Sequence, residues 1–228
     1  MYKYPDHNDK NLSKNVINKD WEDFGLEDKY IAEAINKSQK NCRDHLLDAG
    51  CGHGRLIPFF EKIFKTIIAI DPDHDRLTVA QKKFSSRTNI EFFNTFIQDF
   101  YFNHSFDFVV CSHVIQHIST EEVFLVLKKL HSLLKTNGHL MLSTTNWPDD
   151  TDQFEIRNTI NNSFKIVSDQ EFNACAKNCD QHLPTRHFSE KTLLKILETS
   201  NFNIVFSKKY HGFPKVRGDN FILAKKMG

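Results

Sequence analysis

The chain has no long apolar run, few glycines and prolines, and almost no net charge. Its 228 residues include 8 Gly, 6 Pro and 5 Cys, and 30 basic residues against 29 acidic ones give a net charge of +1. No stretch approaches the ~20 apolar residues of a membrane span, and no overall charge attracts nucleic acid or an anionic membrane. The cysteines are odd in number and scattered, unlike a disulfide framework. We therefore expect free thiols, a polar N-terminus without a leader peptide, and a cytoplasmic protein.

Short β-type segments alternate with helical ones from residue 45 onward. At 39% hydrophobic residues, the chain can bury a substantial core. The spacing predicts strands at 45–49, 66–70, 90–93, 106–111, 139–144, 202–206 and 220–224. One helix is well marked, because Ser119 and Glu122 form a capping box and Asn137-Gly138 provides a stop. Such alternation predicts an α/β fold, a doubly wound sheet with helices on both faces.

Two segments stand apart from this alternation. Residues 1–40 are polar with a few apolar points, and we interpret them as an N-terminal helical cap on a domain that spans 41–228. Residues 146–188 lack a clear period and contain many polar side chains, so we expect an insertion or lid there.

The most informative motif is a glycine-rich run directly after the first predicted strand. It reads Asp48-Ala49-Gly50-Cys51-Gly52-His53-Gly54. Glycines crowded at a strand end indicate a sharp turn or the close approach of a ligand, and ligands of doubly wound sheets bind at the carboxyl ends of the strands. A dinucleotide site requires its third glycine one residue later, and Asp48 places negative charge where phosphates would approach. The run therefore favours a ligand without phosphate.

The run closely resembles the first motif of the class I S-adenosylmethionine-dependent methyltransferases, and the resemblance continues in register to about residue 146. It implies a Rossmann-like seven-stranded sheet in the order 3-2-1-4-5-7-6 with an antiparallel last strand. It also implies an enzyme that binds S-adenosylmethionine. Within the family, the chain looks like the branch of the ubiquinone-biosynthesis O-methyltransferases.

The resemblance assigns several residues to the cofactor. Asp71, at the end of the second strand, would accept hydrogen bonds from the ribose, although a helix N-cap is the alternative role. Arg55 would hold the methionine carboxylate unless it is a solvated helix charge. The complete set of expected cofactor contacts is Asp48, Gly50, Gly52, Gly54, Arg55, Asp71, Ile97, Gln98 and Cys111.

The adenine side departs from the common family pattern. Phe96 stands where the usual acidic residue is expected. Either Asp99 is shifted into that role, or Ile97 and Gln98 line the adenine, and we favour the second alternative because of a similar run in the protein N-terminal methyltransferases.

Two histidines follow the fourth predicted strand, where the fold presents the transferable methyl group. His113 and His117 are both candidates for a general base, since histidine suits proton transfer at neutral pH. We favour His113 because it lies nearer the end of the strand. His117 has a structural alternative as a buttress for the loop. Their spacing also permits a metal site completed by His182 or His187, although loss of the family's two glutamates argues against Mg²⁺ and no metal is expected as a cofactor.

Polar and aromatic residues of the insertion are candidates for contact with the acceptor. They are Asn146, Trp147, Arg186 and His187. We expect transfer of a methyl group to an O, N or S nucleophile of a small-molecule acceptor, by a monomer or homodimer that does not bind nucleic acid. The alternatives are a macromolecular acceptor, either a protein N-terminus or an RNA 3′ end, and a non-catalytic cofactor-binding module.

Overall fold

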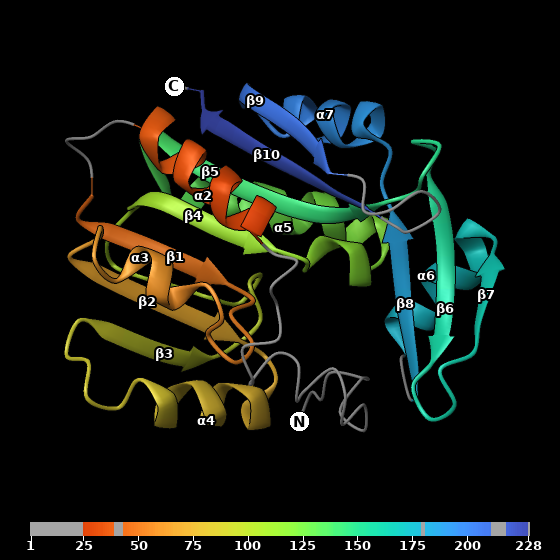
Figure 1. Ribbon diagram of the computed structural model, residues 1–228, viewed down its shortest axis with the longest axis horizontal. Helices are drawn as coiled ribbons and strands as arrows, with labels where there is room; N and C mark the ends of the chain where they lie inside the picture. Colours follow the sequence, from red (N-terminus) through yellow and green to blue (C-terminus); the bar gives the residue numbers. More distant parts are fainter. Residues whose placement is uncertain (1–24, 39–42, 179–180, 211–217, 228) are drawn as a thin grey trace.

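The computed structural model describes residues 25–38, 43–178, 181–210 and 218–227. They form a seven-stranded sheet covered by helices and a separate three-stranded sheet (Figure 1). The strands of the large sheet are β1 (His45–Ala49), β2 (Thr66–Asp71), β3 (Ile90–Asn94), β4 (Phe106–Ser112), β5 (Leu134–Asn146), β9 (Phe202–Tyr210) and β10 (Gly218–Lys226). No helix in these parts of the chain is long and apolar enough to cross a membrane.

The order of the large sheet is β3-β2-β1-β4-β5-β10-β9. The first five strands in this order are parallel to one another, whereas β10 runs antiparallel to both β5 and β9. Counting only the strands of this sheet, this is the predicted order 3-2-1-4-5-7-6 with an antiparallel last strand. The predicted fold is therefore confirmed.

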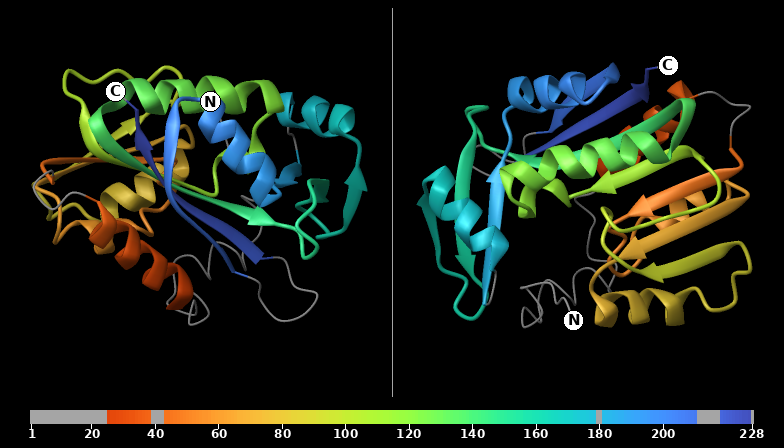
Figure 2. Two further views of the ribbon diagram at one scale, coloured as in Figure 1. Left: turned by 90° about the horizontal axis from the view of Figure 1, so that it is seen from above. Right: turned by 180° about the vertical axis from the view of Figure 1, so that it is seen from behind.

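Helices cover both faces of the large sheet because its strands are apolar on both sides. One core cluster packs under α5 (Thr120–Leu133) and α7 (Glu190–Thr199), and the other under α2 (Gly25–Lys37), α3 (Ile57–Phe60) and α4 (His74–Lys83) (Figure 2). Of the predicted N-terminal cap, α2 buries Ile31, Ala34 and Ile35, and the Tyr30 ring lies 5.7 Å from that of Phe221 in β10. The rest of the predicted cap, residues 1–24 and 39–40, lies outside the described residues.

The helix α5 begins as predicted but ends earlier. Ser119 and Glu122 form the capping box. The helix stops at Leu133, and β5 starts at Leu134, so the expected stop at Asn137-Gly138 is wrong. These two residues instead lie where the pairing of β4 with β5 shifts register, and Asn137 adopts φ 67°. The turn residues therefore produce an irregularity within a strand.

Residues 146–188 contain a small sheet that the sequence pattern does not reveal. Its antiparallel strands lie in the order β7 (Phe164–Val167), β6 (Gln153–Asn158), β8 (His182–His187). Helix α6 (Asp169–Lys177) packs on one face, where the Phe172 ring lies 5.1 Å from that of Phe154. The small sheet stands beyond the carboxyl ends of the parallel strands (Figure 1). Its action as a lid remains a prediction.

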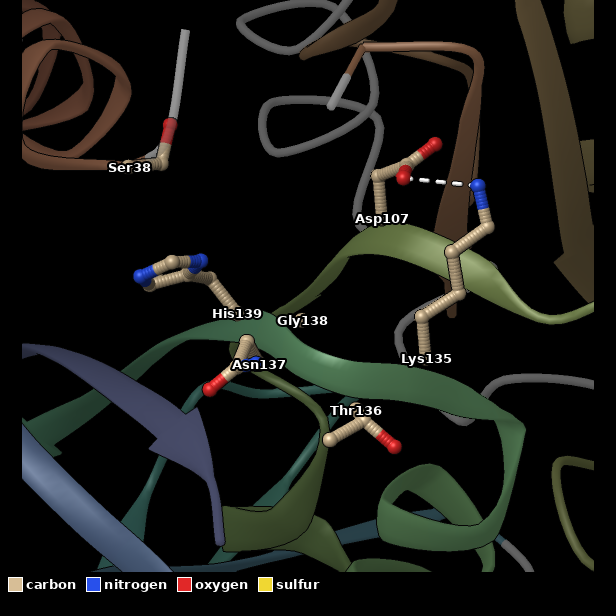
Figure 3. A pocket seen from close by; sticks show the side chains of 7 residues that line it. All are labelled: Ser38, Asp107, Lys135, Thr136, Asn137, Gly138 and His139. Atoms are coloured by element: carbon tan, nitrogen blue, oxygen red, sulfur yellow. Dashed lines mark hydrogen bonds and ion pairs between the residues drawn. The ribbon is translucent and has the colours of Figure 1, made fainter. Parts of the chain in front are cut away.

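At the opposite ends of the strands, Asp107 joins β1, β4 and β5. One carboxylate oxygen accepts the backbone N–H groups of Asp44 (3.0 Å) and His45 (2.9 Å), and the other lies 2.7 Å from Nζ of Lys135. A small pocket beside this ion pair is lined also by Ser38, Thr136, Asn137, Gly138 and His139 (Figure 3). The pocket lies at the amino ends of the strands, away from the glycine run.

We expect Asp107→Ala to lower the free energy of unfolding by about 3 kcal/mol, because it leaves two backbone N–H groups without their acceptor. Urea unfolding followed by circular dichroism measures the loss. The control is Glu121→Ala, whose carboxylate is exposed and forms a surface ion pair with Lys177, and which we expect to change stability by less than about 0.5 kcal/mol. Equal unfolding midpoints for the two variants would contradict the assignment.

Candidate functional site

The glycine run adopts a backbone that requires glycine. Gly50, Gly52 and Gly54 have φ of 84°, 52° and 73°, in the left-handed region that other residues rarely adopt. The N–H groups of Gly50 and Cys51 both donate to the Ile70 carbonyl at the end of β2, at 2.8 and 3.0 Å. A Cβ at Gly50 would also collide with Cγ2 of Val114. The loop is thus held tightly between β2 and the segment after β4.

Asp71 ends β2 and points into this loop. Its two oxygens each accept one backbone N–H, from Gly52 and Asp73, both at 2.8 Å. A carboxylate has about four acceptor positions, so capacity remains for further donors. Burial raises the pKa of Asp71, and nearby Arg76 opposes the increase.

The alternative role of Asp71 as a helix N-cap is wrong. Asp73 caps α4, since its side chain accepts the N–H groups of Asp75 and Arg76. Asp71 instead holds the N–H groups of Gly52 and Asp73 at this edge of the sheet. Arg76 beside it was not among the residues expected from the sequence, because a basic residue in the first turn of a helix has no distinctive pattern.

Asp48 is a second buried carboxyl group, at the end of β1. Burial raises its pKa to about 7, with Arg55 opposing the increase and Asp71 adding to it. Nη2 of Arg55 lies 3.5 Å from Oγ of Ser112 at the end of β4. Arg55 therefore connects the glycine run to the end of β4.

The two cysteines near this site are both buried, and burial raises the pKa of both thiols. Cys51 is buried in the glycine run, and Cys111 of β4 packs in the hydrophobic core. Burial raises the pKa of the Cys111 thiol to about 12, so the group stays neutral. Any contact between Cys111 and a ligand would come from its backbone.

The turn after β3 lies beside Asp71. The N–H of Thr95 donates to the Asp71 carbonyl at 3.3 Å. In this turn Ile97 is buried and Gln98 is partly buried, whereas Phe96 and Asp99 are exposed. The turn thus places Ile97 and Gln98 at the same sheet edge as the glycine run.

The loop after β4 begins with a strained residue. His113 has φ 56°, which is uncommon for a residue with a side chain and is found more often at functional sites. Its N–H donates to the Ser143 carbonyl in β5 at 2.9 Å. The ring is partly buried, with Nδ1 3.3 Å from Oε1 of Gln116.

His117 lies in the short 3₁₀ helix η3 (Ile115–His117), and both of its ring nitrogens have partners. Nδ1 lies 2.8 Å from the Pro184 carbonyl in β8, and Nε2 lies 3.2 Å from Nε2 of Gln116. Burial lowers its pKa to about 3, although the bond to Pro184 opposes the decrease. The neutral ring braces the loop against the small sheet, which is the structural alternative considered for this residue.

The end of β5 meets β8 at a group of buried polar side chains. Asn146 is fully buried, with Nδ2 3.5 Å from Oδ1 of Asn220. The Trp147 ring lies 5.0 Å from that of His187, and Nε2 of His187 lies 3.6 Å from the carboxylate of Glu155 in β6. Glu155 and His187 are both almost fully buried. This group faces the same edge of the large sheet as the loop after β4.

Arg186 lies on the other face of β8. It pairs with Phe154 across the sheet, and its guanidinium lies 5.2 Å from the Phe154 ring centroid and 4.4 Å from that of Phe188. Its Nη2 lies 2.6 Å from Asp152, which also accepts the N–H of Ser189. Successive residues of a strand point to opposite faces, so Arg186 and His187 do not line one surface. The geometry favours a structural role for Arg186.

The predicted metal candidates do not come together. The described residues contain no group of three or more His, Cys, Asp or Glu side chains that could hold an ion. His182 and His187 begin and end β8, about 16 Å apart along the strand. The nitrogens of His117 are bonded to protein groups instead.

We expect Asp152→Ala to lower the free energy of unfolding at pH 7 by about 3 kcal/mol, since it leaves a buried guanidinium unpaired. Burial opposes ionisation of Asp152, but bonds from Arg186 and Ser189 outweigh it, so its pKa is lowered. A lowered native pKa stabilises the fold above the unfolded value near 3.9 and loses this effect as the pH falls through the native value.

The difference between wild type and Asp152→Ala should therefore shrink in acid, which urea titrations from pH 7 to about pH 2 measure, since the loss falls below the unfolded pKa. Asp149→Ala, at an exposed turn, is the control. A difference that stays constant with pH would contradict the ionic part of the assignment.

Comparison with known proteins adds to this geometry. Residues 23–206 match the family model described as "Methyltransferase domain". An uncharacterized methyltransferase of Oceanobacillus iheyensis is 25% identical over 182 residues, which are 79% of this chain and 78% of that protein. A ubiquinone biosynthesis O-methyltransferase of Bradyrhizobium diazoefficiens is 29% identical over 126 residues, 51% of this chain and 49% of that protein. The chain thus aligns with about half the length of the latter relative.

Solved structures share the fold. A methyltransferase of Clostridium acetobutylicum, described as S-adenosylmethionine-dependent, superimposes with a TM-score of 0.69 at 19% identity. The match includes 95% of this chain and 97% of that protein. The 1,6-didemethyltoxoflavin-N1-methyltransferase of Burkholderia thailandensis, solved with 1,6-didemethyltoxoflavin and S-adenosylhomocysteine, has a TM-score of 0.68 at 18% identity, covering 95% and 85%. At these identities the similarity shows the arrangement of the elements.

Proposed function

The chain belongs to the class I S-adenosylmethionine-dependent methyltransferases, and from this premise we propose that it methylates an O, N or S atom of a small molecule, with S-adenosylhomocysteine as product. The observation that carries the proposal is the junction of three loops at one sheet edge. Gly52 donates to Asp71, Val114 packs on Gly50, and His113 follows β4 with a strained backbone. In this proposal Asp71 is the ribose acceptor and His113 the proton acceptor, both at this edge of the sheet.

The described residues fit the cofactor. Asp71 retains acceptor capacity for the ribose, and the left-handed backbone of Gly50, Gly52 and Gly54 turns the loop sharply at this edge of the sheet. Asp48 and Arg55 would contact the amino acid end. Burial raises the pKa of Asp48 to about 7, and a cationic group bound beside it would lower that pKa and favour the ionised carboxylate. Ile97 and Gln98 would line the adenine. When bound, S-adenosylmethionine supplies an electrophilic methyl carbon on a sulfonium.

His113 is the proposed general base. Methyl transfer is an in-line displacement, so most of the rate comes from holding the nucleophile at the correct distance and angle. An acceptor that arrives protonated must also lose a proton. The Nε2 atom of His113 would accept it, while Nδ1 contacts Gln116. His117 is less suited to act as the base, since both of its ring nitrogens have partners.

The small sheet supports a small acceptor over a macromolecular one. It stands beyond the carboxyl ends of the parallel strands, and β8 contacts η3 through His117 and Pro184 (Figure 1). Asn146, Trp147 and His187 would contact the acceptor from this side. A small sheet at this edge would limit access to the proposed site, so a compact acceptor suits it better than a folded one.

We expect Asp71→Ala to weaken binding of S-adenosylhomocysteine by about 10- to 100-fold, because one or two hydrogen bonds to a charged group are lost. Titration calorimetry measures the affinity, and circular dichroism checks folding. Asp99→Ala, at an exposed position in the neighbouring adenine turn, should bind normally. Unchanged binding by Asp71→Ala would remove the ribose assignment, and weakened binding by Asp99→Ala would favour the shifted-acid alternative.

We expect His113→Ala to lower turnover by about 10²- to 10⁴-fold at unchanged S-adenosylhomocysteine affinity. The acceptor for this assay comes from cell extract incubated with the enzyme and methyl-labelled S-adenosylmethionine, then separated into metabolites, protein and RNA. Label in metabolites supports the proposal, whereas label in protein or RNA favours a macromolecular acceptor. If no fraction is labelled although the cofactor binds, a non-catalytic binding module is favoured.

A further inference from the structure

Gln116 joins two histidines and two backbone groups in one chain of hydrogen bonds. Its Oε1 accepts the Thr145 N–H at 2.8 Å and lies 3.3 Å from Nδ1 of His113. Its Nε2 lies 3.2 Å from Nε2 of His117, whose Nδ1 lies 2.8 Å from the Pro184 carbonyl. The chain therefore begins at a backbone N–H in β5 and ends at a backbone C=O in β8.

These two backbone groups set the direction of every bond between them. The Thr145 N–H can only donate, so the atom of Gln116 that it meets is the carbonyl oxygen and the other is the NH₂ group. That NH₂ group can only donate, so Nε2 of His117 accepts. The Pro184 carbonyl can only accept, so Nδ1 of His117 carries the hydrogen. Both ends independently require the same neutral form of His117.

The same reasoning extends to His113. Because Oε1 of Gln116 can only accept, Nδ1 of His113 must donate to it. Neutral His113 then carries its hydrogen on Nδ1 and a lone pair on Nε2. A general base requires a ring nitrogen with a free lone pair, and second partners commonly determine which nitrogen that is.

The surroundings hold Gln116 in this role. Its side chain is almost fully buried, and it lies in η3 between β5 and β8. The backbone of His113 is held separately by the Ser143 carbonyl. A buried amide in this position has little freedom to exchange its oxygen and nitrogen. The exchange would bring its NH₂ group against the Thr145 N–H, so that two donors would face each other.

We propose that Gln116 is a positioning residue that selects the Nδ1–H form of His113. Through His117, it also links the position of that hydrogen to the contact of η3 with β8. The role in catalysis rests on the proposed function of His113 as the base. The assignment of hydrogens rests only on the hydrogen-bond chain. A carboxylate at this position could accept from Thr145 and His113 but could not donate to His117.

The test is ¹⁵N NMR of the histidine rings in the full chain, which distinguishes Nδ1–H from Nε2–H directly. Signals are assigned with His113→Gln and His117→Gln. Wild type should show both rings as Nδ1–H. In Gln116→Leu, His113 should lose its preference for Nδ1–H, whereas His117 should keep its hydrogen on Nδ1 because Pro184 remains. In Gln116→Glu, His113 should stay Nδ1–H and the contact with His117 should be lost.

The control is Gln170→Glu, the same change at an exposed position of α6, which should leave both rings unchanged. Finding either histidine of the wild type as Nε2–H overturns the proposal, even if Gln116→Leu does not fold. With an acceptor in hand, Gln116→Leu should lower turnover tenfold or more at unchanged S-adenosylhomocysteine affinity. If the NMR result holds but His113→Ala retains full turnover, the base assignment fails and the hydrogen-bond assignment stands.

Discussion

The close approach of Val114 to Gly50 is the constraint on which the rest of the site depends. Because Gly50 has no Cβ and adopts φ 84°, the loop after β4 can pack directly on the loop after β1. This contact brings the segment that holds His113 and Gln116 next to the segment that presents Gly52 to Asp71. A side chain at Gly50 would separate the two loops and with them the two halves of the proposed site.

Two buried carboxyl groups at this edge are difficult to explain as structure alone. Keeping Asp48 ionised in its buried position costs roughly 4 kcal/mol at neutral pH, given a pKa near 7. Asp71 is also buried, and its pKa is raised as well. Groups with strongly shifted pKa values gather at functional sites, and a ligand with a cationic end and hydroxyl donors would relieve both groups.

Two of the polar connections between the small sheet and the rest of the chain differ in character. Asp152 binds Arg186 of β8 and the N–H of Ser189 at the start of α7. On the other side, Pro184 of β8 accepts from His117. The first is an ion pair that stabilises the attachment, and the second leads through Gln116 to His113. The attachment of the small sheet and the arrangement of the proposed base therefore share one strand.

The amino-acid sequence by itself indicated where the strands of the large sheet lie, because apolar runs and turn residues are local properties. The order of these strands was predicted only through the resemblance of the glycine run to the methyltransferase family. The sequence also located the glycine run and Asp71, which belong to one short βαβ unit. Tertiary structure alone decided that Arg186 binds Asp152 on the face of β8 opposite His187, and that Gln116 joins His113 to Pro184. These outcomes depend on contacts between residues far apart in the chain, and on which face of a strand meets the core. The sequence did not predict the small sheet for the same reason. Its strands are short and partly polar, and they become recognisable only when β6 pairs with β7 and β8.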